Sequence, residues 1–200
     1  MDVPRPFRQQ IDDGILDRAA ALFARRGFAK TSVQDVADAV GLSKAGLLHH
    51  FRSKDALHGA VLAQAELLGR RALEHVAHLP LGPLRDRRAI EILADVALAH
   101  PGIVALMLAP ATQLEAEVAD ANDDTYFSAL QAFGVDPDQT DPERLIRVLA
   151  ALAALAVLTL AAHQKNQTTE WRPYVVATCF DALGHRSPGV PTLSDVQVEA

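Results

Sequence analysis

Apolar residues recur at helical spacing along most of this chain, and turn-forming residues interrupt them. The first pattern predicts a helix from about Gln9 to Arg26, ended by Gly27. Its inward positions are Ile11, Ile15, Ala19, Leu22 and Phe23. Further along, Ser53 can cap a helix that runs to about His78, where the prolines and glycine of residues 79–83 end it.

Residues 31–55, TSVQDVADAVGLSKAGLLHHFRSKD, predict two short helices around a tight turn. In the first, Val33, Val36, Ala37 and Val40 share one face. Thr31 and Gln34 fit a capping box at its start. Gly41 suits the left-handed residue that ends a helix, and Ser43 can cap the second helix, over 44–51. A short helix held by another in this way fits the major groove of DNA, about 12 Å wide.

Five more helices are predicted in the remaining chain, so the fold class is all-α with about nine helices. Their approximate ranges are 84–99, 102–118, 123–133, 142–164 and 169–183. Pro110 predicts a kink or a break in the second of these helices. The first residues and the tail from 186 to 200 carry prolines and little apolar surface, so we expect both to be loose.

The segment from about Ile15 to Leu57 resembles the amino-terminal domain of the TetR family of bacterial transcriptional repressors. The resemblance rests on Phe23, Gly27-Phe28, Thr31, Ala37, Gly41-Leu42-Ser43-Lys44, His50-Phe51, Lys54 and Leu57 in that order. The family commonly has a phosphate-bonding Tyr where this chain has Leu48. The resemblance implies a helix-turn-helix DNA-binding domain over 1–55 and a helical ligand-binding and dimerisation domain over 56–185. It also implies that the fourth helix acts as a lever between the two.

The predicted DNA contacts lie on and around the second helix of the turn. They are Thr31, Ser43, Lys44, Ala45, Leu48, His49, His50 and Lys54. Lys44, Lys54 and Thr31 are expected on phosphates, whereas the small Ala45 permits close approach to base edges. His49 suits a base or a phosphate, and His50 suits packing or a phosphate; a solvated histidine pair is the alternative. Arg5 and Arg8 could belong to an arm that contacts DNA, and a frayed terminus is the alternative.

The formal net charge of −6 disfavours nucleic acid only at first sight. Residues 1–55 carry nine Lys or Arg against seven Asp, which leaves +2 there and −8 over the rest. Salt screens charges beyond about 8 Å, so the local surface decides docking. The single Cys179 excludes an intramolecular disulfide, and no secretory signal precedes residue 30, so we expect a cytoplasmic protein. The longest apolar run, 148–162, is shorter than the ~18 to 20 residues of a membrane span, which favours a buried helix.

The helix from Arg144 is apolar on nearly every side and needs cover on every side. With the last helix it predicts a four-helix interface between two copies, and hence a palindromic DNA site. The alternative is burial within one chain. The predicted interface residues are Leu152, Leu155, Leu158, Val175, Val176, Cys179, Phe180 and Leu183.

A ligand cavity is the remaining prediction for the second domain, because the family typically binds a small apolar inducer there. Its candidate lining is Leu106, Met107, Tyr126, Phe127, Leu130 and Trp171, with plain core as the alternative. Glu74, His75 and His78 are better explained as exposed residues than as a metal site, and no cofactor is expected.

The sequence contains no nucleophile elbow, zinc-protease motif or phosphate-binding glycine loop, so an enzyme is not expected. A helical dimer that binds a metabolite or protein and has lost DNA binding is the alternative function.

Overall fold

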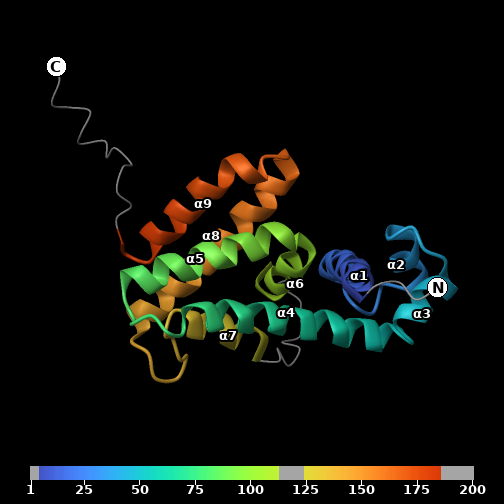
Figure 1. Cartoon of the computed structure of the whole chain (residues 1–200), viewed down its shortest axis with the longest axis horizontal. Coiled ribbons are helices and arrows are strands. Elements are labelled where there is room, and N and C mark those ends of the chain that lie inside the picture. The colour runs from blue at the N-terminus through green and yellow to red at the C-terminus, as the bar shows by residue number, and fades with distance from the viewer. Residues whose placement is uncertain (1–4, 113–123, 186–200) are drawn as a thin grey trace, which may run out of the picture.

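The computed structural model describes residues 5–112 and 124–185, and within them the side chains of 11–109 and 127–185. Every regular element in these ranges is a helix, which confirms the all-α prediction (Figure 1). The helices are α1 (Arg5–Arg26), α2 (Val33–Ala39), α3 (Lys44–His50), α4 (Lys54–Val76), α5 (Pro83–Ala99), α6 (Pro101–Thr112), α7 (Asp124–Ala132), α8 (Pro142–Lys165) and α9 (Thr168–Ala182).

The helix boundaries differ from the predicted ones mainly at α1 and α6. Helix α1 begins at Arg5, four residues before the predicted start. Helix α6 starts at Pro101, where proline suits a first helical position, and it continues through Pro110 to Thr112. The predicted continuation to residue 118 lies outside the described residues, as do the tail and the side chains of Arg5 and Arg8. Between α5 and α6 the chain turns by 103°.

Buried apolar side chains form two cores joined by α4 (Figure 1). The first core combines α1, α2, α3 and the first half of α4, and it includes Ile103 from α6. The second combines the last turns of α4 with α5, α7, α8 and α9. Leu68 belongs to the first core and Ala72 to the second. Helix α4 therefore serves both halves, and α6 reaches from the body into the first core.

Buried polar groups fix the end of the body that lies far from the first core. Asp86 is 1% exposed and accepts hydrogen bonds from Arg144 Nη2 and His185 Nε2, both at 2.7 Å. Arg144 also donates to the carbonyl of Phe133. On the surface, Arg172 of α9 makes a two-pronged ion pair with Asp95 of α5. These contacts join helices that lie far apart in the sequence.

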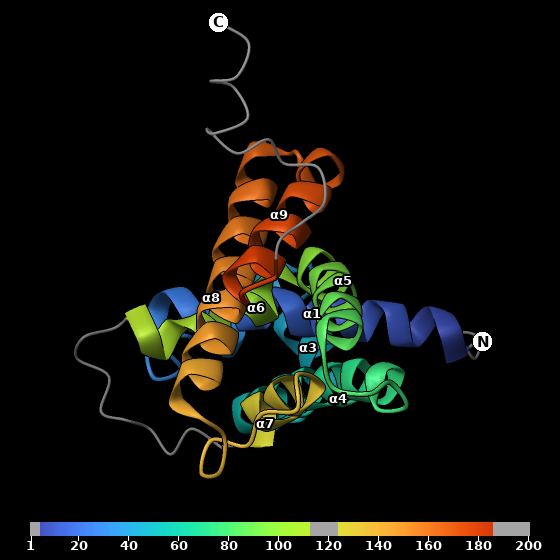
Figure 2. The same ribbon diagram turned by 90° about the vertical axis from the view of Figure 1, so that its left-hand side faces the viewer.

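Helix α8 is only partly covered by its own chain. It packs against α5 and α6 and lies alongside α9 (Figure 2), yet Ile146, Leu149 and Val157 are 64%, 48% and 56% exposed. By length and composition the 24-residue helix could cross a membrane, which corrects the estimate from the shorter run 148–162. Only 28% of its most apolar window is buried, so the predicted buried helix is also only partly right. Since core helices of soluble proteins have the same composition, no membrane span is inferred.

Candidate nucleic-acid interface

The two short helices and their turn form as predicted, with one correction at the cap. Ser32, not Thr31, is the N-cap of α2, and its hydroxyl accepts from the Asp35 amide. The Asp35 carboxylate in turn accepts a hydrogen bond from the Ser32 amide at 2.8 Å. The side-chain bond from Ser32 is the main cause that lowers the pKa of Asp35. Asp35 thus takes the place that the predicted box gave to Gln34, which instead donates to Asp38.

Gly41 ends α2 with a φ of +72°, a conformation that strains residues with a side chain. Leu42 packs against the first core, and its amide donates to the Ala37 carbonyl at 2.9 Å. Ser43 caps α3 by accepting from the Gly46 amide. The turn therefore sets the direction of α3 through local bonds and one apolar contact.

Helix α3 lies at an end of the molecule (Figure 1) and presents one face to solvent. Ser43, Lys44, Ala45 and His49 are exposed, Leu48 is half-buried, and Leu47 is 1% exposed on the opposite side. The outward face carries small and polar residues, which is what close approach to a groove requires. Five of the eight predicted contact positions share this part of the surface.

The remaining three predicted contacts are engaged inside the protein. Thr31 is 1% exposed, and its hydroxyl donates to the carbonyl of Gly27 at 2.9 Å. Lys54 donates to the carbonyl of Phe28 at 3.0 Å, with its Nζ 4.1 Å from the centre of that ring. Both residues hold the loop between α1 and α2. Thr31 is too buried to reach a phosphate, which corrects that prediction. For Lys54 we propose the structural role in place of the predicted phosphate contact.

His50 is also directed inward. Its Nδ1 lies 2.7 Å from Asp12 Oδ1 on α1, and its side chain is 18% exposed. A carboxylate only accepts, so the ring N–H donates. This agrees with the packed alternative for His50 and removes it from the DNA contacts. His49 remains exposed beside it, with the two rings 6.1 Å apart.

Two exposed cations outside the predicted set flank the turn element in the sequence. Lys30 precedes α2, and Arg52 follows α3. Both are exposed, whereas Arg26 is paired with Asp35 at 2.9 Å. The sequence positions of Lys30 and Arg52, directly next to the two short helices, could have identified them as candidate DNA contacts. His58 packs on Phe23 and Phe28, and burial lowers its pKa, which favours the neutral ring.

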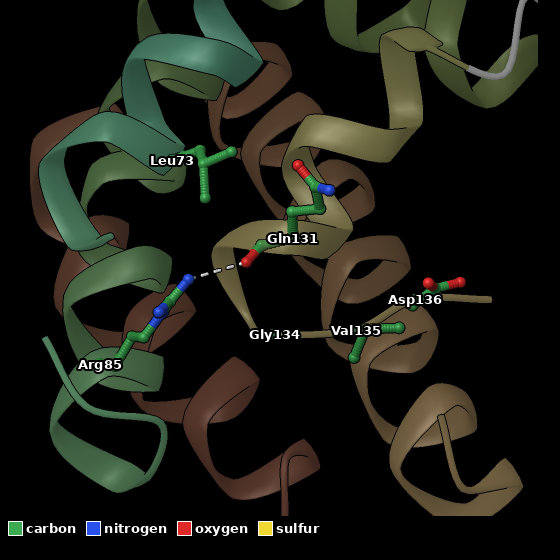
Figure 3. Close-up of a pocket in the computed structure, with 6 residues that line it drawn as sticks. All are labelled: Leu73, Arg85, Gln131, Gly134, Val135 and Asp136. Carbon is green, nitrogen blue, oxygen red and sulfur yellow. Dashed lines mark hydrogen bonds between the residues drawn. The ribbon is translucent and has the colours of Figure 1, made fainter. Parts of the chain in front are cut away.

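The candidate ligand residues are not brought to one place. Leu106 and Met107 pack on the first core, whereas Leu130 and Trp171 belong to the second. Phe127 is 36% exposed, and the side chain of Tyr126 lies outside the described residues. The described part of the chain has a different depression, about 320 Å³ in volume, between α4, α5 and the segment after α7 (Figure 3). It is lined by Leu73, Arg85, Gln131, Gly134, Val135 and Asp136.

Arg85 lies at this depression, and the protein already uses its guanidinium. The group donates to the carbonyls of Ala132, Gln131 and Leu79, and the bond to Gln131 is drawn in Figure 3. The side chain therefore holds the segment after α7 against α5. Among the described residues no cluster of three metal-ligating side chains occurs.

The predicted dimer residues lie mostly on the wrong face. Leu152 and Leu158 are half-buried against the second core. The other six are 0–7% exposed inside it: Leu155, Val175, Val176, Cys179, Phe180 and Leu183. Because these side chains are used within one chain, they cannot cover a second copy.

Comparisons with known proteins agree with this geometry. Residues 15–61 match the family model of bacterial regulatory proteins, tetR family. The HTH-type transcriptional repressor KstR2 of Rhodococcus jostii (strain RHA1) is 48% identical over 48 residues, 24% of each chain. The match thus spans about a quarter of that relative's length.

Similarity over the whole length comes from solved structures. The TetR family transcriptional regulator PfmR from Thermus thermophilus has a TM-score of 0.51 and 25% identity, covering 88% of this chain and 97% of that one. A TetR-like transcriptional regulator from Rhodococcus sp. RHA1 has a TM-score of 0.54 at 21% identity, covering 92% and 99%. These structures confirm the all-α fold, and the family model confirms the resemblance for residues 15–61. The matched family consists of regulators, in agreement with the prediction that this chain is not an enzyme.

Proposed function

We propose that this chain, whose residues 15–61 belong to the tetR family of bacterial regulatory proteins, is a cytoplasmic, sequence-specific DNA-binding transcriptional repressor. The observation that carries the proposal is the outward face of α3, held by a capped turn whose element is flanked in sequence by exposed cations. Lys44 and the flanking Lys30 and Arg52 supply phosphate contacts. Ala45, Leu48 and His49 face base edges, where apolar side chains suit a thymine methyl and an imidazole suits an acceptor.

A second copy completes the DNA-binding unit in this proposal. Ile146, Leu149 and Val157 recur at helical spacing on α8, and the exposed Ala150 and Ala153 lie between them. On α9, which packs against α8, Tyr174 is 73% exposed. Stable interfaces bury about 800 Å² on each partner, which two helices from each copy provide. The two heads then read half-sites about 34 to 36 Å apart or at a multiple of that distance.

Selection of binding sites from random DNA tests the proposal. We expect selection to enrich a DNA site with two-fold symmetry, and gel shifts to show that the protein binds this site at moderate salt. An excess of the same site should displace the labelled DNA, whereas unrelated DNA should not. If no sequence is enriched over bulk DNA, the alternative of a helical dimer without DNA binding replaces it.

Sedimentation of two variants tests the dimer. Val157→Glu places a charge in the exposed stripe and is expected to yield single chains. Leu84→Glu is the matched control, because Leu84 is 66% exposed but belongs to α5 and not to the stripe on α8. Equal behaviour of the two variants would contradict the interface.

For regulation, we propose that a small apolar molecule binds beside α6. The supporting observation is that Val104, Ala105 and Leu106 of α6 are apolar and only half-buried. Such a molecule releases DNA only if it prefers the conformation that binds DNA poorly. A thermal-shift screen of lipophilic compounds, followed by gel shifts with each hit, tests this. Hits that raise the melting temperature without changing DNA affinity would contradict it.

A further inference from the structure

Helix α1 lies between α6 of the body and the reading helix α3 (Figure 1). A carboxylate of α1 binds each of them. We propose that α1 is a coupling element that transmits the position of α6 to α3 through Asp17 and Asp12. The consequence for DNA affinity rests on the proposed function, whereas the mechanical coupling does not. The resemblance to the family pointed instead to α4 as the lever.

The joint between α1 and α6 uses the first amides of α6. Asp17 Oδ1 accepts from the amides of Gly102 at 2.8 Å and Ile103 at 3.1 Å. The first amides of a helix have no acceptor within the helix, and a neighbouring residue in sequence normally supplies one. Here the acceptor comes from a residue 85 positions earlier. The start of α6 is therefore fixed to α1 as well as to His100 before it, whose carbonyl accepts from the Val104 amide.

Backbone packing at the same joint allows little freedom. Gly102 is buried, and a Cβ atom added there would overlap the carbonyl oxygen of Asp17. Ile103, 5% exposed, enters the first core with α1 and α4. Hydrogen bonds, close backbone contact and a shared core thus bind α6 and α1 together. Closely packed joints of this kind move as a unit rather than deforming smoothly.

The joint between α1 and α3 is the His50–Asp12 pair. His50 is the last residue of α3, and its ring N–H reaches Asp12 over 2.7 Å. Asp12 and Asp17 lie on the same continuous helix of 22 residues. A shift of α6 therefore displaces α1, and α1 displaces the end of α3. Because α6 also packs against α8, the path starts in the body, close to the proposed dimer helices.

The first experiment uses the full-length protein without DNA. Gly102→Ala forces the α1–α6 joint apart, and Gly14→Ala is the control, because Gly14 is an exposed α1 glycine with open space around it. Amide hydrogen exchange is then measured along the chain. We expect Gly102→Ala to speed exchange roughly tenfold in the first turn of α6 and also at the α3 amides of Leu47 and Gly46. Faster exchange in α6 with α3 equal to the control would overturn the coupling.

A milder pair of variants covers the case in which Gly102→Ala does not fold. Asp17→Ala removes only the acceptor of the two α6 amides, and Asp12→Asn weakens only the tie to His50. Asp17→Ala is expected to speed exchange in α3 in the natural background but much less when combined with Asp12→Asn. Effects that simply add would overturn the coupling, because independent joints behave additively.

Gel shifts with the selected DNA site supply the functional arm. Gly102→Ala and Asp17→Ala are expected to weaken binding within the ~5- to 150-fold range of ordinary coupling, although neither residue lies on the outward face of α3. Unchanged affinity in both variants would contradict a role in DNA binding. If the natural protein selects no site, the proposed function fails, and the exchange experiments still decide the mechanical coupling.

Discussion

Lys44 and Lys54 were both predicted to contact phosphates, and the structure now predicts opposite results when each is replaced. Lys44 is exposed at the start of α3. Lys54 donates to the Phe28 carbonyl at 3.0 Å and lies over the Phe28 ring. Lys44→Ala should therefore change DNA binding and leave folding intact, whereas Lys54→Ala should mainly change folding.

The size of the Lys44 effect follows from counterion release. Each phosphate contact contributes about 0.9 to the slope of log affinity against log salt, so one contact per head in a dimer contributes ~1.8. Over a fourfold rise in salt, that slope corresponds to roughly 12-fold in affinity. A hydrogen bond from a charged group contributes about 1.5 to 3 kcal/mol to the free energy of unfolding. Because Lys54 is partly exposed, solvent screening reduces this contribution to about 1 to 2 kcal/mol.

Gel shifts of the selected DNA site over 50 to 200 mM salt measure the slopes, and urea unfolding measures the stabilities. We expect a slope reduced by ~1.8 for Lys44→Ala and an unchanged slope for Lys54→Ala. Lys54→Ala should also lower the free energy of unfolding. The reasoning is refuted if Lys54→Ala lowers the slope as much as Lys44→Ala does while its stability is unchanged.

Three further predictions concern the remaining polar and titratable groups. Asp86→Ala should lower the free energy of unfolding by about 1.5 to 3 kcal/mol, because the partly exposed Arg144 loses the buried carboxylate that it binds; a loss under about 0.5 kcal/mol in urea unfolding would contradict this. Burial raises the pKa of Cys179 to about 12, so stability should fall as pH rises from about 9 towards 12, where only the unfolded thiol ionises. Cys179→Ala should abolish that part of the fall in pH-dependent melting. Ser32→Ala should raise the pKa of Asp35 towards its ordinary value and so weaken stability above that value, as followed by carboxylate NMR titration; an unmoved pKa would count against the capping box.

Local features of the sequence predicted the helices and the turn. Apolar spacing located the nine helices of the described residues, and Gly41 and Ser43 adopt the predicted end and cap. Helical hydrogen bonds join residues four apart, so the information for each helix lies within its own segment. The one cap that moved did so by a single residue, from Thr31 to Ser32.

The sequence by itself could not decide which side chains the protein uses internally. Lys54 and His50 satisfy the same local pattern as DNA contacts, but groups 26 and 38 residues away engage them. Likewise, the apolar pattern of α8 predicts a helix, but it does not predict that Leu155 is buried and Val157 is 56% exposed.

Helix positions, their caps and the reading turn were thus determined by the sequence, because they depend on neighbours along the chain. Tertiary structure alone decided the free face of α3, the uncovered stripe of α8 and the joint of Asp17 with α6. These features arise only when helices distant in sequence pack together. Packing decides which side chains have partners inside the protein, and the side chains that stay exposed are the ones that can contact DNA or a second copy.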